Sequence, residues 1–271
     1  MREAEASQPP LDSAHIALPP AFRGVLVVGD VHGREELFAP LCALAAEEGL
    51  FLVALGDLVD RGPAPAGVLR RMLRLVAAGA GLLLRSNHDE RLWRHLVRGG
   101  EVRNAELGAT LAQLAAACDG ARLREAFLRC YPRMPYVLGL GAAVMVHGAV
   151  LPEMLPPVAR LDRRGRHHAL YGQTRGRDAR GLPVRVYDWL DRLPEGLLVI
   201  AGHDPLSDLK LRMRTGARGA RLLHLDSGAG QGGPLSAVVL DRAGRPLGAW
   251  QMRPGESRPL SCSWVPDPER R

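Results

Sequence analysis

The chain has 271 residues, of which 46% are hydrophobic and 24% charged, enough to bury a large core; this excludes a disulfide-stapled peptide and an intrinsically disordered protein. The formal net charge is +7, and every basic residue except Lys210 is an arginine. Such a charge favours phosphorylated or nucleic-acid partners, although a GC-rich genome that encodes Arg in place of Lys would give the same composition. The positions of the arginines must decide between these two explanations.

Short apolar runs alternate with helical patterns along the chain, which is typical of an α/β fold. We expect flexible tails over residues 1–22 and 251–271 and a single domain over 23–250. Apolar residues at helical spacing predict a helix near 68–76 and a helical segment over about 91–129. The buried strands that the apolar runs predict are 25–28, 51–55, 82–84, 144–146, 197–201, 222–225 and 237–240.

Polar side chains directly follow five of these predicted strands. Each places a carboxylate, an amide or an imidazole at the carboxyl end of a strand, where the ligand sites of open α/β sheets gather. The segments are GDVHG at 29–33, GDLVDRG at 56–62, SNHD at 86–89, HGA at 147–149 and GHD at 202–204.

These segments offer oxygen and nitrogen donors without a thiolate, a set that suits Mn²⁺, Fe²⁺ or Zn²⁺. Six ligands are too many for one catalytic ion that keeps an open position, whereas two ions about 3.5–4 Å apart and sharing a carboxylate would use them all. The candidate ligands are Asp30, His32, Asp57, Asn87, His147 and His203.

The order of the motifs resembles the calcineurin-like metallophosphoesterases, in the branch that holds the phosphoprotein phosphatases and bacterial diadenosine tetraphosphatase. The resemblance covers about residues 24–250 and implies an α/β fold: a sandwich of two mixed β-sheets flanked by helices. It also implies that Asp30 and His32 bind the first ion and that Asp57 bridges both ions. Asn87, His147 and His203 would then hold the second ion. We expect two divalent ions, with Mn²⁺ first and Fe, Zn, Ni or Co as alternatives.

Three further residues of the motifs receive catalytic roles from the resemblance. His88 would be the general acid that protonates the leaving group, Asp60 would orient it, and Arg61 would hold the phosphate. General chemistry agrees, because a metal-bridging hydroxide is a nucleophile near neutral pH and an imidazole supplies a proton at its natural pKa. An arginine fork also suits bidentate phosphate binding.

A closer likeness lies downstream, in LYGQT at 170–174, GLPVR at 181–185 and YDW at 187–189. This stretch resembles the phosphatase module of bacterial polynucleotide kinase-phosphatase, an RNA-repair enzyme, and implies action on 2′,3′-cyclic or 2′-phosphate ends. The kinase part is absent, because a Walker A loop needs a Gly-Lys-Ser/Thr sequence and Lys210 is followed by Leu211. A Ser/Thr protein phosphatase, a diadenosine tetraphosphatase-like hydrolase and an inactive relative that binds phosphorylated ligands remain alternatives.

Three positions depart from the family pattern without removing a ligand. Ser86 replaces a glycine before Asn87, Asp204 stands where a hydroxyl residue follows the second-metal histidine, and Ala229 replaces a cysteine. These departures leave turnover and metal preference open. His95, His167, His168 and His224 have no motif support and are expected to be ordinary surface or core residues.

The positive charge is concentrated in two segments, residues 160–180 with net +5 and residues 207–221 with net +4, while the rest sums to −2. We expect these segments to wall the metal cleft and attract a polyanionic substrate, nucleic-acid ends among them, with a solvated charged rim as the alternative. For Arg85 a structural salt bridge is an equal alternative. The substrate-binding candidates are Arg85, Tyr171, Arg175, Arg185, Arg212 and Arg214.

The four cysteines, Cys42, Cys118, Cys130 and Cys262, lack metal-site spacing and predict neither a zinc cluster nor a disulfide framework. A reducing cytoplasm therefore fits. No apolar run approaches the roughly 18 residues of a membrane span, and the N-terminal residues lack signal-peptide order. We expect no membrane contact and no stable protein partner.

Overall fold

The computed structural model describes residues 10–179, 181, 183–205 and 210–266. Parts of the expected tails (1–9 and 267–271) and of the two basic segments (180 and 207–209) lie outside the described residues. Within the described ranges, no helix combines the length and the apolar character that crossing a membrane would need.

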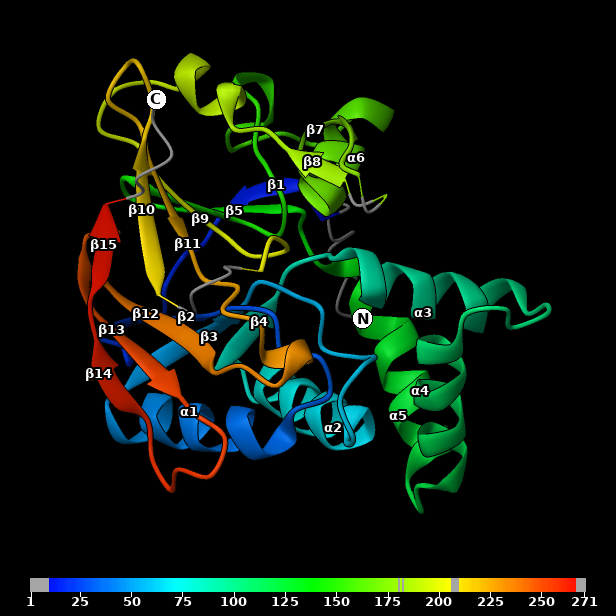
Figure 1. Ribbon diagram of the computed structural model, residues 1–271. Helices are drawn as coiled ribbons and strands as arrows, with labels where there is room; N and C mark the ends of the chain where they lie inside the picture. Colours follow the sequence, from blue (N-terminus) through cyan, green and yellow to red (C-terminus); the bar gives the residue numbers. More distant parts are fainter. Residues whose placement is uncertain (1–9, 180, 182, 206–209, 267–271) are drawn as a thin grey trace, which may run out of the picture.

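Two large mixed sheets form the centre of the described structure, with helices around them (Figure 1). The α/β sandwich expected from the sequence is therefore confirmed. One sheet has the strand order β14 (Leu260–Cys262), β13 (Pro246–Met252), β12 (Leu235–Asp241), β2 (Gly24–Val28), β3 (Leu50–Ala54) and β4 (Gly81–Leu83). The other has the order β1 (Ser13–His15), β5 (Val137–Leu140), β6 (Ala143–Val146), β9 (Leu198–Ala201), β11 (Arg221–His224), β10 (Leu211–Thr215) and β15 (Trp264–Pro266).

Helices cover the sheets, and a small ribbon of β7 (Thr174–Arg177) and β8 (Pro183–Arg185) lies beside the last helix (Figure 1). The α-helices are α1 (Glu35–Glu47), α2 (Pro65–Ala77), α3 (Asn87–Arg98), α4 (Ala105–Ala116), α5 (Gly120–Cys130) and α6 (Arg163–Tyr171). The short 3-10 helices are η1 (Tyr131–Arg133), η2 (Pro152–Met154), η3 (Asp188–Arg192) and η4 (Ala229–Gln231). Local signals begin several of them: Pro65 opens α2, while Asn104 and Asp162 cap α4 and α6.

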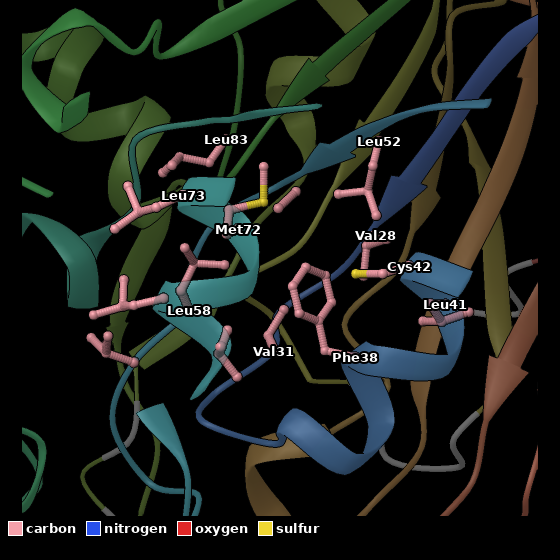
Figure 2. Close-up of a cluster of buried hydrophobic side chains, with 14 of the residues drawn as sticks. Val28, Val31, Phe38, Leu41, Cys42, Leu52, Leu58, Met72, Leu73 and Leu83 are labelled. Atoms are coloured by element: carbon pink, nitrogen blue, oxygen red, sulfur yellow. The ribbon is translucent and has the colours of Figure 1, made fainter. Parts of the chain in front are cut away.

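Strand β2 is buried on both faces, which explains its unbroken apolar sequence. Because side chains alternate across a strand, Leu26 and Val28 pack toward α1 and α2, while Val25 and Val27 pack toward the other sheet. Figure 2 shows the first of these layers, where Phe38 of α1 and Met72 of α2 lie against the strands. The two sheets and the helices thus hold the strand ends in fixed positions.

The expected tails are wrong where the structure describes them as strands. Residues 13–15 form β1, which pairs in parallel with β5, and Asp12 beside them is buried. Residues 260–262 and 264–266 form β14 and β15 at the edges of the two sheets. These strands are three residues long and carry no apolar run, so hydrophobic periodicity could not reveal them; tertiary pairing decides them.

The helical segment expected over 91–129 is three helices, and it begins four residues earlier, at Asn87. Ser86 precedes α3 in extended conformation, and Gly99 ends it with φ 66°. The motif residues Asn87 and His88 therefore occupy the first turn of α3, where the helix dipole and free amides stabilise negative charge. All seven predicted strands are present within one or two residues of the expected bounds.

Candidate metal centre

The motif residues meet where parallel strands of both sheets end. In one sheet, Val28 pairs with Ala54 and Ala54 with Leu83, so β2, β3 and β4 end at the same level. In the other, Val146 pairs with Ala201, so β6 and β9 also end together. The loops after these five strands carry all six predicted metal ligands. Strand register alone therefore explains why segments far apart in sequence converge.

The backbone at these strand ends is held in an unusual conformation. Within the described part of the chain, only five non-glycine residues have positive φ, and all belong to the predicted motifs. Left-handed backbone costs free energy for residues with a Cβ and concentrates at functional sites. The five are His32 (47°), Asp57 (47°), Asp60 (72°), Arg61 (64°) and His203 (68°).

Asp57 lies at the centre of a ring of imidazoles. Its carboxylate oxygens are 3.5 Å from Nε2 of His147, 3.6 Å from Nε2 of His32 and 3.9 Å from Nε2 of His88. Burial alone would raise the pKa of Asp57, but these imidazoles and His203 hold it below its usual range. Burial lowers the pKa of His32 to about 4. The centre thus favours an ionised Asp57 beside a neutral His32, the protonation states that metal ligands need.

Asp30 faces the second sheet and is fixed by its backbone. The amide of His203 donates to both carboxylate oxygens of Asp30, at 3.2 and 3.0 Å. Gly202 permits this approach, because a Cβ there would lie 2.1 Å from Oδ1 of Asp30. Burial, together with the nearby carboxylate of Asp226, raises the pKa of Asp30 well above its ordinary value. A positive ion at this position would relieve both effects.

His88 and Asp60 form a buried pair at the edge of the same centre. Nδ1 of His88 lies 2.8 Å from Oδ2 of Asp60, which leaves Nε2 facing Asp57. Thr110 of α4 donates to Oδ1 of Asp60 at 2.7 Å, and Arg91 donates to Oδ2 at 2.6 Å. Burial lowers the pKa of His88, but Asp57 and the hydrogen bond to Asp60 reverse this and leave it raised. This geometry suits a proton donor aimed at the metal centre.

Arg61 reaches the rim of the centre and is held there by a second residue of α4. Its Nε lies 3.4 Å from Oε1 of Glu106, and its side chain is 31% exposed. The other oxygen of Glu106 is 3.3 Å from Nη2 of Arg91. One carboxylate thus contacts both guanidinium groups that border the site, leaving Arg61 accessible to a phosphate.

The donor atoms fit divalent metal ions. Nε2 of His203 is buried without a hydrogen-bond partner among the described residues, a costly state for a polar atom unless an ion satisfies it. Asp57 shares one group of mutually close donors with His32 and His88, and another with His147 and His203. Asn87 completes the second group, since its Oδ1 lies 2.8 Å from Nε2 of His147. Two groups that share a carboxylate fit two ions, but the predicted ligand Asp30 belongs to neither group, and the first group contains His88.

Ser86, the departure from the family glycine, supports the centre. Its hydroxyl accepts a hydrogen bond from the amide of Asp57 at 2.8 Å and donates to Asp89 at 2.9 Å. Asp89 also accepts from the amide of Leu58. Burial raises the pKa of Asp89 to about 7. The serine therefore ties the bridging loop to the start of α3 instead of displacing Asn87.

Arg85 makes structural contacts, and its expected role in substrate binding stays a prediction. Its guanidinium donates to the carbonyl oxygens of Pro132 and Met134 and to the hydroxyl of Tyr136. It also lies over the ring of Tyr136, 4.8 Å from the centroid. These contacts use most of its donors to fix the turn before β5.

The other substrate-binding candidates lie at different distances from the centre. The ring of Tyr171 is 6.2 Å from that of His203, and Arg185 donates to the carbonyl of Tyr171 at 2.5 Å. Arg214 stacks on Tyr187, whose hydroxyl bonds Asp204 beside His203. Arg212 is half-buried on β10. Arg175, on β7, has a side chain 78% exposed and pairs with Asp188, so no contact links it to the centre.

Four residues at the site were not predicted from the sequence: Arg91, Glu106, Thr110 and Asp226. Asp226 follows β11, so the strand-end rule that found the other ligands could have found it. Arg91 lies three residues after His88 on α3, a spacing that brings helical side chains together. Glu106 and Thr110 carried no signal, because only the packing of α4 against the motif loops brings them there.

Comparison with known proteins agrees with this geometry. The family model of calcineurin-like phosphoesterases matches residues 24–226, about three quarters of the chain. The chain is similar to the asymmetrical bis(5′-nucleosyl)-tetraphosphatase PrpE of Oceanobacillus iheyensis, with 27% identity over 225 residues, which cover 78% of this chain and 86% of that protein.

Two solved structures share the fold. A protein proposed to be a diadenosine tetraphosphatase aligns with TM-score 0.55 and 22% identity, covering 90% of this chain and all of that one. A Saccharomyces cerevisiae serine/threonine phosphatase similar to human phosphatase PP5 aligns with TM-score 0.52 and 17% identity, covering 92% and 87%. With the family match over residues 24–226, these findings show that the chain belongs to the calcineurin-like phosphoesterase family and is a phosphoester hydrolase.

Proposed function

We propose that the protein is a two-metal hydrolase of nucleotide phosphates, and that dinucleoside tetraphosphates are its first substrate class. The observation that supports the chemistry is that Asp57 is shared by two groups of close donors, and that His88, a member of the first group, pairs with Asp60. The curated relative that matches most of the chain is a bis(5′-nucleosyl)-tetraphosphatase, which supports the substrate class.

Each residue of the site has its own role in the proposed reaction. Asp30, His32, Asp57, Asn87, His147 and His203 would hold two divalent ions, for which Mn²⁺ is our first choice. Such ions lower the pKa of coordinated water and neutralise phosphate charge. His88 carries a proton on Nε2 toward the leaving group, and Asp60 fixes the ring through Nδ1. Arg61 binds a phosphate oxygen at the rim, in competition with Glu106.

The test is a comparison of rates on three substrates with Mn²⁺ held constant: diadenosine tetraphosphate, a phosphopeptide and an RNA 2′,3′-cyclic phosphate end. We expect the highest kcat/KM for diadenosine tetraphosphate. A higher value for the phosphopeptide would favour a protein phosphatase. Failure to hydrolyse any substrate, including an aryl phosphate, with every divalent metal would refute the enzyme and leave a phosphate-binding relative.

Action on RNA ends is the second candidate, and the basic rim near His203 favours it. Arg185 lies 3.8 Å from Asp204. Arg214 stacks on Tyr187, whose hydroxyl bonds the same Asp204. Arg185 belongs to the downstream stretch that resembles the RNA-repair phosphatase. Arg214 belongs to β10, in the basic segment 207–221 that we expect to attract polyanions. Under this candidate, R212Q/R214Q raises KM for the RNA end more than for an aryl phosphate. Equal effects on both substrates would remove the support that this rim gives to RNA.

A further inference from the structure

A second cleft lies between α3 and α6 and is lined by residues of both helices. It encloses about 1090 Å³, and five arginines and four aromatic or imidazole rings line it, against two carboxylates. Sites for small organic ligands generally enclose about 300–1,000 Å³. The cleft is slightly larger than this range, and its arginines and rings suit a charged, ring-containing molecule.

Two cations of this cleft have no counter-ion. Arg166 is bound to Asp12 at 3.1 Å and Arg94 to Glu90 at 2.9 Å. In contrast, Arg163 and Arg164, in the exposed first turn of α6, make no ion pair with any described residue. Guanidinium groups bind phosphate oxygens in pairs, and the one carboxylate at this helix end, Asp162, is engaged as the N-cap by the amide of Gly165.

The rings form the remaining walls. The ring of His167 lies 5.0 Å from that of Tyr171, tilted by 34°, and Trp93 faces the cleft from α3. Flat rings of this kind bind nucleobases by stacking, with little dependence on base identity. Nε1 of Trp93 and Oε2 of Glu90 are buried without a hydrogen-bond partner among the described residues, although Arg85 lies 4.0 Å from that oxygen. These buried atoms therefore have unused hydrogen-bonding capacity in the wall of the cleft.

Both walls lead directly from the metal centre. Helix α3 begins at Asn87, and a rise of 1.5 Å per residue places Trp93 about 9 Å further along its axis. On the opposite wall, the ring of Tyr171 is 6.2 Å from that of His203. A molecule with one phosphate at the metal centre can therefore extend its remaining phosphates into the cleft.

We propose that this cleft binds the part of a nucleoside polyphosphate that does not react: its base against the rings of Trp93 and Tyr171, and its distal phosphates on Arg163 and Arg164. The assignment deepens the proposed function and rests on it for the reacting phosphate. It explains why Arg163 and Arg164, in an exposed helix turn, make no ion pair with any residue that the structure describes.

The kinetic test uses R163Q/R164Q, with R122Q/R124Q on the exposed face of α5 as the control of equal charge change. We expect R163Q/R164Q to raise KM for diadenosine tetraphosphate about tenfold or more relative to KM for an aryl phosphate, because two charge-assisted contacts are lost. The control should match the unaltered protein. An equal rise for both substrates, or no rise, would overturn the assignment.

A binding test separates this inference from the proposed function. Titration calorimetry with ATP and with inorganic triphosphate, both in excess chelator, measures affinity without turnover. We expect ATP to bind more tightly than triphosphate, and R163Q/R164Q to lose most of the affinity for both. Binding that depends on these arginines, without hydrolysis of diadenosine tetraphosphate, would refute the function and retain the cleft. Equal affinity for ATP and triphosphate would refute the base-binding wall.

Discussion

The metal centre at the strand ends and the first turn of α6, which we call the α6 rim, lie close together but are built in opposite ways. At the centre, Asp30, Asp57 and His147 are buried, and the backbone adopts left-handed conformations that cost free energy. At the rim, Arg163 and Arg164 are exposed on one helix turn and make no ion pair with described residues. The centre is fixed by two sheets, while the rim depends on side chains that can change without disturbing the core.

Because of this difference, we expect the centre to determine the hydrolysis reaction and the rim to determine which substrate binds. Hydrolysis needs donor atoms placed to within a fraction of an ångström, which buried backbone supplies. Binding a polyanion needs charge at the right distance, which exposed arginines supply. We therefore expect substitutions of residues in the centre to abolish turnover. Substitutions of residues that support the centre should lower kcat, and substitutions at the rim should alter mainly KM.

The largest effect is expected for Asp57→Asn, because this carboxylate belongs to both donor groups. Turnover should become undetectable. Mn²⁺ at about 100 times its dissociation constant should stabilise the unaltered protein by about 2.7 kcal/mol and the variant much less, measured by thermal unfolding. Asp188→Asn, an exposed carboxylate on η3, is the control and should keep both properties. Full stabilisation of Asp57→Asn by Mn²⁺ would contradict the bridging role.

His88→Ala should come next, with kcat reduced about 10²–10⁴-fold, the usual loss for a general acid, while metal binding persists. Metal analysis alongside steady-state kinetics separates the two properties. His95→Ala, on the same helix, should leave kcat unchanged. Loss of metal in proportion to activity would assign His88 to metal binding instead of proton donation.

Thr110→Val tests the support of the centre. The substitution removes the hydroxyl that donates to Asp60 but keeps the side-chain volume, so kcat should fall about 10–100-fold with little change in KM. Thr110→Ser restores the hydroxyl and should recover most of the activity. Failure of serine to rescue would mean that the methyl packing, and not the hydrogen bond, matters.

Glu106→Gln tests the boundary between centre and rim. Removing this carboxylate frees Arg61 and Arg91 from a partly exposed ion pair, so inorganic phosphate should inhibit about two- to fivefold more tightly. Glu101→Gln, whose exposed partner is Arg103, should leave inhibition unchanged. Weaker inhibition in Glu106→Gln would show that Glu106 positions Arg61 for phosphate.

The smallest effect is expected for Arg175→Gln. Its side chain is 78% exposed and lies on the outer ribbon, so the free energy of unfolding should change by less than about 0.5 kcal/mol. Its kcat/KM on diadenosine tetraphosphate should match that of the unaltered protein, in contrast to R163Q/R164Q. A comparable rise in KM would mean that the net charge of the rim, and not the α6 cleft, attracts the substrate.

Much of the centre could be predicted because each motif follows an apolar run. A run such as 25–28 indicates a buried strand, and parallel strands end at one edge, so Asp30 and Asp57 had to approach each other. Arg85 shows the limit of this reasoning. An arginine directly before Ser86 and Asn87 is equally compatible with a phosphate ligand or a turn anchor, and only the tertiary structure shows that it bonds the carbonyls of Pro132 and Met134.

The sequence by itself determined the α/β class, the seven apolar strands and the six candidate metal donors, because these depend on local periodicity and on residues adjacent to strand ends. Tertiary structure alone decided the rest. It pairs β1 and β15 into the second sheet, brings Glu106 and Thr110 of α4 to the proposed proton donor, and leaves Arg163 and Arg164 without a counter-ion among the described residues. Those features depend on contacts between segments distant in sequence, which no local pattern encodes.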